Sequence, residues 1–272
     1  MREGMEKDLL AARLEDAVRR CEAGALSVLP FLTPRECRRA ERELTMRGMR
    51  EQFWFWGGYP TAERACLFLL PDYLVACLSA PLWECTADEV LTLLGDDATD
   101  AVAAVRVVGG GFRNLSHRDF LGSVLGLGLE RDALGDVAVQ NEHEAVIFCP
   151  QNLVPFLVVE LTKVATDTVK CRPYEVDAQF TDGKRYRPIS DTVASARLDC
   201  VVAALCNLSR EAAQSAIRSG TVEVEFETEE RVDFVLTPPA TISVRGYGRF
   251  ILRSFDGETR KGRMRLRADQ LI

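Results

Sequence analysis

The spacing of apolar and polar positions divides the first part of the chain into two helices and a pair of strands. Apolar residues recur at helical intervals over residues 5–22. In "FLTPRECRRAEREL", Thr33 is a predicted N-cap whose capping box is completed by Glu36, and a helix is expected to run to about Arg47 and to end at Gly48. The runs "FWFW" and "ACLFLLP" then predict two strands of a hairpin.

The middle of the chain alternates strands with helices. Apolar, β-compatible runs occur over residues 101–111, in "AVIFCP" and in "TVKCRPYEV". Between them, Ser116 is predicted to cap a helix that ends near Leu125, and Asn152 to cap a second helix in "LVPFLVVELTKV". This alternation predicts an α+β fold.

A polar, turn-rich stretch, "DGKRYRPISDT" at residues 182–192, predicts a boundary between domains. The expected parts are an N-terminal helical segment with a β-hairpin over residues 1–100, a central α+β part of the same or a second domain over residues 101–181, and a C-terminal domain over residues 190–272.

The C-terminal domain opens with "RLDCVVAALCNLSREAAQSAIRSG", residues 197–220, whose pattern predicts two short helices joined by a turn. The first has one apolar face, formed by Leu198, Val201, Val202 and Leu205. Ser209 is the predicted N-cap of the second, and its inward positions are expected to be Ala212, Ala213, Ala216 and Ile217. The strict alternation of "TVEVEFE" then predicts one half-buried strand.

Arginines recur around this helix pair. Arg197 precedes the first helix, Arg210 begins the second and Arg218 ends it. If the pair folds back on itself, Arg197 and Arg210 lie close together, and Gln214 projects from the same side as Arg210 because it follows at i+4. Such a row suits phosphates and groove edges. A solvated helix surface is the alternative that spacing alone leaves open.

The tail favours the nucleic-acid interpretation. It is strongly basic and alternates as strands do, and it places Tyr247 between two arginines, where the ring is a candidate for stacking on a base. The residues of the tail that we expect to contact RNA are Arg245, Tyr247, Arg249, Arg260, Lys261 and Arg263.

Composition limits the other possibilities. The 272 residues carry a net charge of -7, which argues against a protein that coats nucleic acid over its whole surface but not against a local basic patch. Nine cysteines without a C-x-x-C pair, and only two histidines, predict free thiols and no metal or other cofactor. The charged N-terminus and the lack of a long apolar run predict a cytoplasmic protein with no membrane partner.

The stretch "RLDCVVAALCNLSREAAQSAIRSGTVEV" resembles the alpha-L RNA-binding motif named for ribosomal protein S-four. Its matching residues include Arg197, Ser209, Arg210 and Gln214. The segments "FLTPRE", "FWGGYPTAERACLFLLPDY", "HRDFLGSVLGLGLERDALGDV", "SVRGYGRF" and "GETRKGR" are similar to the bacterial YlmH-type proteins.

The resemblance implies a non-enzymatic protein that binds structured RNA, rRNA or tRNA, on the large ribosomal subunit, with no small-molecule substrate. It also implies a role in the quality control of stalled subunits that carry peptidyl-tRNA. The sequence departs from the family in one segment. The family has a basic turn after its strand, whereas here Glu223, Glu225 and Glu227 are expected on one face of that strand. We expect this face to point away from RNA.

Three alternatives remain. Pseudouridine synthases carry the same motif and a catalytic aspartate in an R-L-D context, but Asp199 is expected to orient or pair with Arg197. In the central part, Arg113, His117 and Arg118 either decorate the start of a helix or form a second phosphate contact there. The aromatic run "FWFW" either packs in the core or offers one face to a protein partner.

Overall fold

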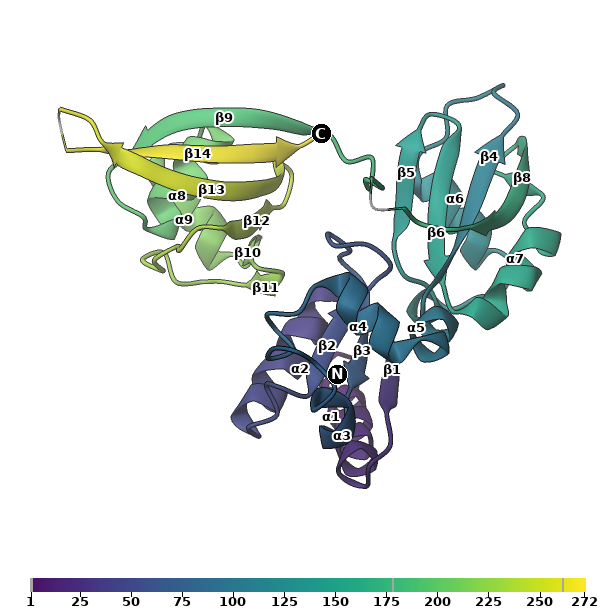
Figure 1. Ribbon diagram of the computed structural model, residues 1–272. Coiled ribbons are helices and arrows are strands. Elements are labelled where there is room, and N and C mark those ends of the chain that lie inside the picture. The colour runs from purple at the N-terminus through teal and green to yellow at the C-terminus, as the bar shows by residue number, and fades with distance from the viewer. Residues whose placement is uncertain (1, 178, 261) are drawn as a thin grey trace. The chain divides into compact units, whose positions relative to one another are not determined.

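The computed structural model describes residues 2–177, 179–260 and 262–272, and the chain divides into two units, Met1–Gly183 (unit 1) and Lys184–Ile272 (unit 2) (Figure 1). Both units combine helices with antiparallel sheets, so the α+β class predicted from the sequence is confirmed. No described helix has the length and apolar character needed to cross a bilayer.

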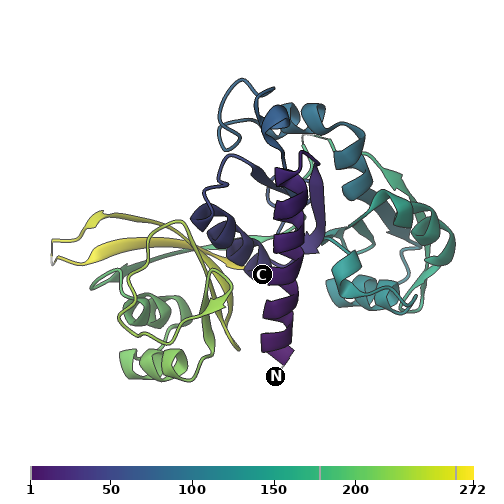
Figure 2. The same cartoon turned by 90° about the horizontal axis from the view of Figure 1, so that it is seen from below.

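The N-terminal part of unit 1 is a three-stranded sheet with helices on both sides. Its strands have the order β1-β3-β2, so β3 is central and its residues are buried. The long α1 stands out in Figure 2. The elements are, in chain order, α1 (Arg2–Glu22), β1 (Ser27–Leu32), α2 (Pro34–Met46), β2 (Phe53–Trp56), β3 (Ala65–Leu69), α3 (Asp72–Val75), α4 (Ala87–Leu94) and α5 (Asp96–Ala101).

Two of the sequence predictions in this part are confirmed. Thr33 accepts from the backbone N–H of Glu36, and the carboxylate of Glu36 accepts from the backbone N–H of Thr33 at 2.7 Å. β2 and β3 form the predicted antiparallel hairpin, with Trp54 opposite Phe68. The alternating aromatics of β2 serve two cores, because Phe53 and Phe55 pack on the α1 side while Trp54 and Trp56 pack on the side of α4.

The central part of unit 1 is a five-stranded antiparallel sheet of order β5-β6-β4-β8-β7. Its two helices, α6 and α7, pack on the same face, where Phe120 and Leu157 meet Val105 and Val107 of β4. The elements are β4 (Ala103–Gly109), α6 (His117–Leu125), η1 (Arg131–Ala133), β5 (Val137–Asn141), β6 (Glu144–Cys149), η2 (Gln151–Leu153), α7 (Val154–Glu160), β7 (Lys163–Val164) and β8 (Asp167–Tyr174).

Ser116 caps α6 as predicted, but the prediction that Asn152 caps the next helix is wrong. Asn152 lies inside the 3-10 turn η2, and the N-cap position of α7 is taken by Leu153, which makes no side-chain capping bond. Pro150 and Pro155 flank the 3-10 turn, and the apolar residues between them are fixed by packing rather than by a polar cap.

Asp136 joins the two parts of unit 1. Its carboxylate accepts from the hydroxyl of Tyr59 at 2.7 Å and from the backbone N–H groups of Glu63 and Arg64 at 2.8 and 3.2 Å. Arg64 itself is buried, and its guanidinium donates to the carbonyls of Leu134, Phe31 and Arg131. The segment "GGYPTAERA" is therefore the loop that fastens the β2–β3 hairpin to the central sheet.

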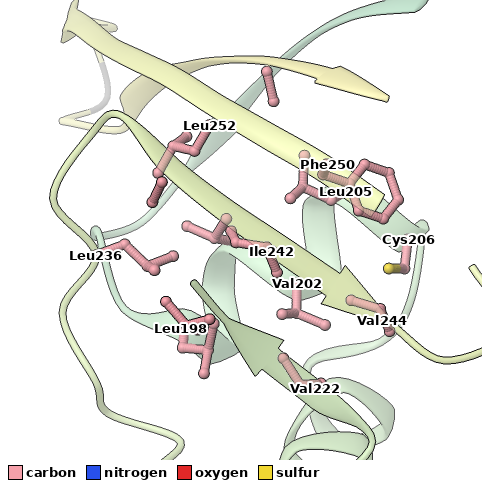
Figure 3. Packing of buried hydrophobic residues seen from close by; sticks show 14 of the residues in the cluster. Leu198, Val202, Leu205, Cys206, Val222, Leu236, Ile242, Val244, Phe250 and Leu252 are labelled. Carbon is pink, nitrogen blue, oxygen red and sulfur yellow. The ribbon is translucent and has the colours of Figure 1, made fainter. Parts of the chain in front are cut away.

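Unit 2 is a six-stranded antiparallel sheet of order β11-β10-β12-β13-β14-β9, with both helices on one face (Figure 1). Residues of the helices interlock with the inward side chains of the strands, as Figure 3 shows for Leu198, Val202, Ile242 and Phe250. The elements are β9 (Tyr186–Val193), α8 (Leu198–Cys206), α9 (Arg210–Arg218), β10 (Val222–Val224), β11 (Glu227–Thr228), β12 (Ala240–Val244), β13 (Gly248–Glu258) and β14 (Met264–Leu271).

The division between the units, after Gly183, falls within the predicted boundary segment 182–192, although most of that segment is strand β9, which pairs along its whole length with β14. Two predictions for this region are wrong. Ala212 is exposed rather than inward. The stretch "TVEVEFE" is not one strand, because the chain reverses at Glu225 and Phe226, both with positive φ, and pairs Val224 with Glu227.

Candidate nucleic-acid interface

The two helices of unit 2 begin as the sequence predicts. Arg197 is the N-cap residue of α8, and Asn207 ends that helix in the left-handed conformation. Ser209 caps α9 by accepting from the backbone N–H of Ala212 at 3.1 Å. The apolar residues of α8 are buried against the sheet.

A buried carboxylate collects the polar side chains at these starts. Asp199 is completely buried and accepts hydrogen bonds from three side chains. Its Oδ1 accepts from Nε of Arg197 at 3.1 Å. Its Oδ2 accepts from Nε of Arg210 at 3.1 Å and from Nε2 of Gln214 at 2.8 Å. The expectations that Arg197 lies near Arg210 and that Gln214 shares its side are therefore confirmed.

This arrangement leaves cationic groups at the surface. The side chains of Arg197 and Arg210 keep 36% and 57% of their area exposed although each donates through Nε to a buried acceptor. A guanidinium has five N–H donors, so those not directed at Asp199 remain available to a ligand. The planar fork is thus held in one orientation before anything binds.

The ionisation of Asp199 follows from its partners. Burial acts to raise the pKa of its carboxyl, but hydrogen bonds from Arg197, Gln214 and Arg210 outweigh burial and hold the pKa well below its usual range. The same bond to Asp199 raises the pKa of Arg197. Because Asp199 is buried, ionised and fully engaged by its neighbours, it is not placed to act as a base on a substrate.

The other predicted contacts of unit 2 fall into two groups. Arg245, Tyr247 and Arg249 lie at the β12–β13 turn, where the backbone N–H of Arg245 donates to the carbonyl of Thr221, just beyond α9. Tyr247 is 44% exposed, and the guanidinium of Arg249 lies 5.2 Å from the ring centroid of Phe226. Arg218, at the end of α9, is exposed and makes no contact with Asp199.

The second group lies at the other end of β13, at its turn into β14. Arg260 is exposed there, whereas the guanidinium of Arg263 is held by β9, since Nε donates to the hydroxyl of Thr192 at 3.0 Å. Lys261 lies outside the described residues. The structure therefore separates the basic tail, which the sequence presented as one stretch, between two ends of the sheet.

The acidic residues near β10 do not form the single face that the sequence suggested. Glu223 lies on the strand, but Glu225 belongs to the turn, where its Oε1 accepts from the backbone N–H of Thr241 at 2.6 Å. Glu227 lies on the returning strand, opposite Val224. The expected run of three carboxylates along one strand is thus wrong.

In the central part, the start of α6 carries the second predicted phosphate contact. His117 and Arg118 are exposed in its first turn. Arg113 lies 3.7 Å from the carboxylate of Asp119, which completes the capping box with Ser116. Hydrogen bonds with Ser116 lower the pKa of Asp119, so a negative charge already occupies this helix start. No group of three or more potential metal ligands occurs among the residues described.

Known proteins match both the central part of the chain and a larger share of its length. The family model described as "Putative RNA-binding domain in YlmH" matches residues 107–178, from β4 through β8. The chain is also 27% identical over 212 residues to the ribosome-associated protein quality control protein P2 of Bacillus subtilis, covering 78% of this chain and 75% of that protein. The central part of the chain thus matches a YlmH domain, and most of the chain is similar to a ribosome-associated protein.

Among solved structures, the cell division protein YlmH of Streptococcus pneumoniae aligns with a TM-score of 0.45 at 20% identity, covering 62% of this chain and 91% of that one. The YlmH family model matches the central sheet and stops short of unit 2. RNA binding is therefore associated with a part of the chain in which the sequence indicated only one possible contact, at α6.

Proposed function

We propose that this protein is a YlmH-type, non-enzymatic RNA-binding protein that docks on structured RNA of the large ribosomal subunit, rRNA or tRNA, through unit 2. The observation that carries the proposal is the cluster of Arg197, Arg210 and Gln214 around the buried Asp199. The alpha-L resemblance of the same residues and the ribosome-associated relative support it. The relative's name further supports a role in the quality control of stalled peptidyl-tRNA complexes.

Each predicted residue has a place in this mechanism. Arg197, Arg210 and Gln214 contact phosphates or groove edges, and Ser209 fixes the start of the helix that carries two of them. Arg218 and the turn formed by Arg245, Tyr247 and Arg249 extend the surface past the end of α9. Arg260, Lys261 and Arg263 contribute a separate contact, as do Arg113, His117 and Arg118 at α6.

The test is co-sedimentation with large ribosomal subunits at several salt concentrations, comparing the wild type with Arg197→Glu/Arg210→Glu. We expect the variant to stay at the top of the gradient, because it replaces two phosphate-binding cations with anions, and the wild type to lose affinity steeply as salt rises. The matched control is Arg253→Glu/Arg265→Glu, an equal change of charge on strands of the same unit.

If the helix-pair variant, shown to be folded by circular dichroism, sediments with the subunits like the wild type, the proposed surface is wrong. If the control loses binding as much as the helix-pair variant does, the effect comes from net charge and the helix pair has no special part in docking.

A further inference from the structure

The face of the central sheet opposite α6 and α7 is basic. Side chains alternate between faces along a strand, and Val105, Val107, Val169 and Cys171 point to the helices. Their neighbours therefore point the other way. Four of these neighbours form what we call the basic sheet face: Arg106 of β4, Lys163 of β7, and Lys170 and Arg172 of β8.

Strand register places these four residues beside one another. Arg106 is directly opposite Arg172, and Lys170 is opposite Val108 on the same strand pair. Lys163 is opposite Thr168, which is two residues before Lys170 on β8 and so shares its face. Directly opposite residues have Cβ atoms about 5 Å apart, and residues two apart on a strand are separated by about 6.6 Å.

The charge on this face is incompletely neutralised. Arg106 is paired with Glu144, whose Oε1 lies 2.5 Å from its Nε, and its guanidinium lies 5.9 Å from the ring centroid of Tyr174. Lys163, Lys170 and Arg172 are exposed, and within the described chain Lys170 and Arg172 take part in no ion pair. Glu144 compensates only Arg106, so the charge of Lys170 and Arg172 on this face is left without an anion among the described residues.

Only part of this face is used for packing inside unit 1. At the other end of the same strands, Ala104, Phe148 and Tyr174 pack against the N-terminal part of the unit. The strands thus change from apolar to basic along their length. Since internal packing accounts for the apolar end, the basic end is the part that remains for a partner.

An exposed aromatic residue lies at the rim. Phe112 is 93% exposed and belongs to the loop that follows β4. That loop leaves the sheet beside β8, because the backbone N–H of Gly110 donates to the carbonyl of Thr168 at 3.0 Å. An exposed ring at the end of the strands that carry the cations suits a nucleic-acid strand, since bases stack on aromatic rings while phosphates meet Lys and Arg.

We propose that the basic sheet face binds a single-stranded segment of RNA, with its phosphates along Lys170 and Arg172 and a base stacked on Phe112. This goes beyond the docking proposed for unit 2, because it assigns a separate RNA site to unit 1 and different residues to it. The family match over residues 107–178 names an RNA-binding domain, and the register identifies the face and the residues that serve it.

The experiment uses the full chain and a fluorescein-labelled, unstructured 20-nucleotide RNA, with anisotropy measured across a salt series. Lys170→Glu/Arg172→Glu is expected to weaken binding at least tenfold and to reduce the slope of log affinity against log salt by about 1.4, since each phosphate contact to a single strand contributes about 0.7. Phe112→Ala is expected to weaken binding about tenfold with the slope unchanged, because stacking releases no counterions.

Arg19→Glu/Arg20→Glu is the matched control, since it makes the same change of charge at the exposed end of α1. All variants are repeated in the Arg197→Glu/Arg210→Glu background. Binding of the 20-nucleotide RNA that remains in this background is assigned to the basic sheet face. A loss on the sheet face together with an unaffected helix-pair variant would support this inference, and the docking of structured RNA proposed for unit 2 would still be decided by co-sedimentation with ribosomal subunits.

Affinity and slope like those of the wild type in folded Lys170→Glu/Arg172→Glu would overturn the inference. So would a variant that keeps its affinity for the RNA but no longer sediments with ribosomal subunits, because the face would then meet an acidic protein surface rather than RNA.

Discussion

Asp136 in unit 1 and Asp199 in unit 2 are both carboxylates that accept hydrogen bonds from several donors, but the two clusters serve different purposes. Asp136 accepts from Tyr59 and from two backbone N–H groups, all of which belong to the loop that joins the two parts of unit 1. Asp199 accepts only from side chains, and two of these are half-exposed arginines. The nature of the donors distinguishes a carboxylate that holds the fold from one that prepares a surface.

The pKa values of the partners support this distinction. Burial raises the pKa of the Tyr59 hydroxyl well above its usual range, and the charge of Asp136 raises it further, so Tyr59 remains a donor at neutral pH. Around Asp199, in contrast, the hydrogen bond to the carboxylate raises the pKa of Arg197, and the side chains of Arg197 and Arg210 both remain partly exposed to water. A phosphate is therefore able to reach the arginine partners of Asp199. The backbone N–H groups that donate to Asp136 have no further hydrogen to offer a ligand.

The largest effect is expected from Asp136→Ala. The substitution leaves the Tyr59 hydroxyl and the N–H groups of Glu63 and Arg64 without their acceptor, and each such donor costs about 1 kcal/mol or more, so the free energy of unfolding of unit 1 should fall by about 3 kcal/mol. Urea unfolding followed by tryptophan fluorescence measures it, because Trp54 and Trp56 lie in unit 1.

Asp132→Ala is the control for that experiment. Asp132 also approaches Arg64, at 3.7 Å, but its side chain is 77% exposed, so we expect a loss of less than about 0.5 kcal/mol. If both variants lost the same free energy of unfolding, Asp136 would contribute no more to the stability of unit 1 than an exposed ion pair does.

Asp199→Asn sharpens the comparison through the sign of its effect. The variant removes a negative charge beside two arginines, so a purely electrostatic account predicts tighter RNA binding. We expect binding to large ribosomal subunits to weaken about tenfold instead, because Arg197 and Arg210 lose the acceptor that fixes their orientation. The measurement is a co-sedimentation titration, and tighter binding would refute the positioning role.

Acid sensitivity provides an independent measure of Asp199. Because its pKa is lowered in the folded protein, its contribution to stability is complete above the unfolded value of 3.8 and is lost as the pH falls below that value. Asp199→Asn should therefore flatten the fall in the stability of unit 2 in this acid range. Binding at neutral pH should show no titration from this group.

The smallest effect is expected from Ser209→Ala. Loss of the N-cap of α9 should lower the free energy of unfolding of unit 2 by about 1 kcal/mol, and ribosome binding should change little if Ser209 acts only through the helix. Thermal unfolding measures the change. Ser209→Asp retains a capping oxygen, so it should restore stability; weak binding by both variants would instead indicate a direct contact with RNA.

Local signals made part of this architecture predictable. The capping boxes at Thr33 and Ser116 each lie within four residues of sequence, so the starts of their helices could be predicted locally. The helix pair of unit 2 could also be predicted, from the apolar spacing of α8 and from the N-cap at Ser209. The proximity of Arg197 to Arg210 was predicted on the assumption that the helix pair folds back on itself, and it is confirmed by their shared bonds to Asp199.

The features that escaped prediction depend on partners far along the chain. β9 is polar and contains Pro188, and it is a strand because β14, almost eighty residues later, pairs with it. β1 was missed for a similar reason, since Pro30 interrupts its pattern at the sheet edge. The basic sheet face required the pairing of β4 with β8, although the alternation of Lys170 and Arg172 in "TVKCRPY" was a signal that could have been noticed.

Gly183 ends unit 1 in a position that only glycine fits, because its φ is +69° and an added Cβ would lie 1.9 Å from the carbonyl oxygen of Val139. Pairing within unit 2 already includes Arg185, whose carbonyl accepts from the backbone N–H of Ile272. The connection between the units is thus a tether of about two Cα–Cα steps, or roughly 8 Å. If both proposed RNA sites bind one ribosomal particle, so short a tether would give the second site a local concentration on the order of millimolar, and two weak contacts would together give lasting occupancy while each alone released rapidly.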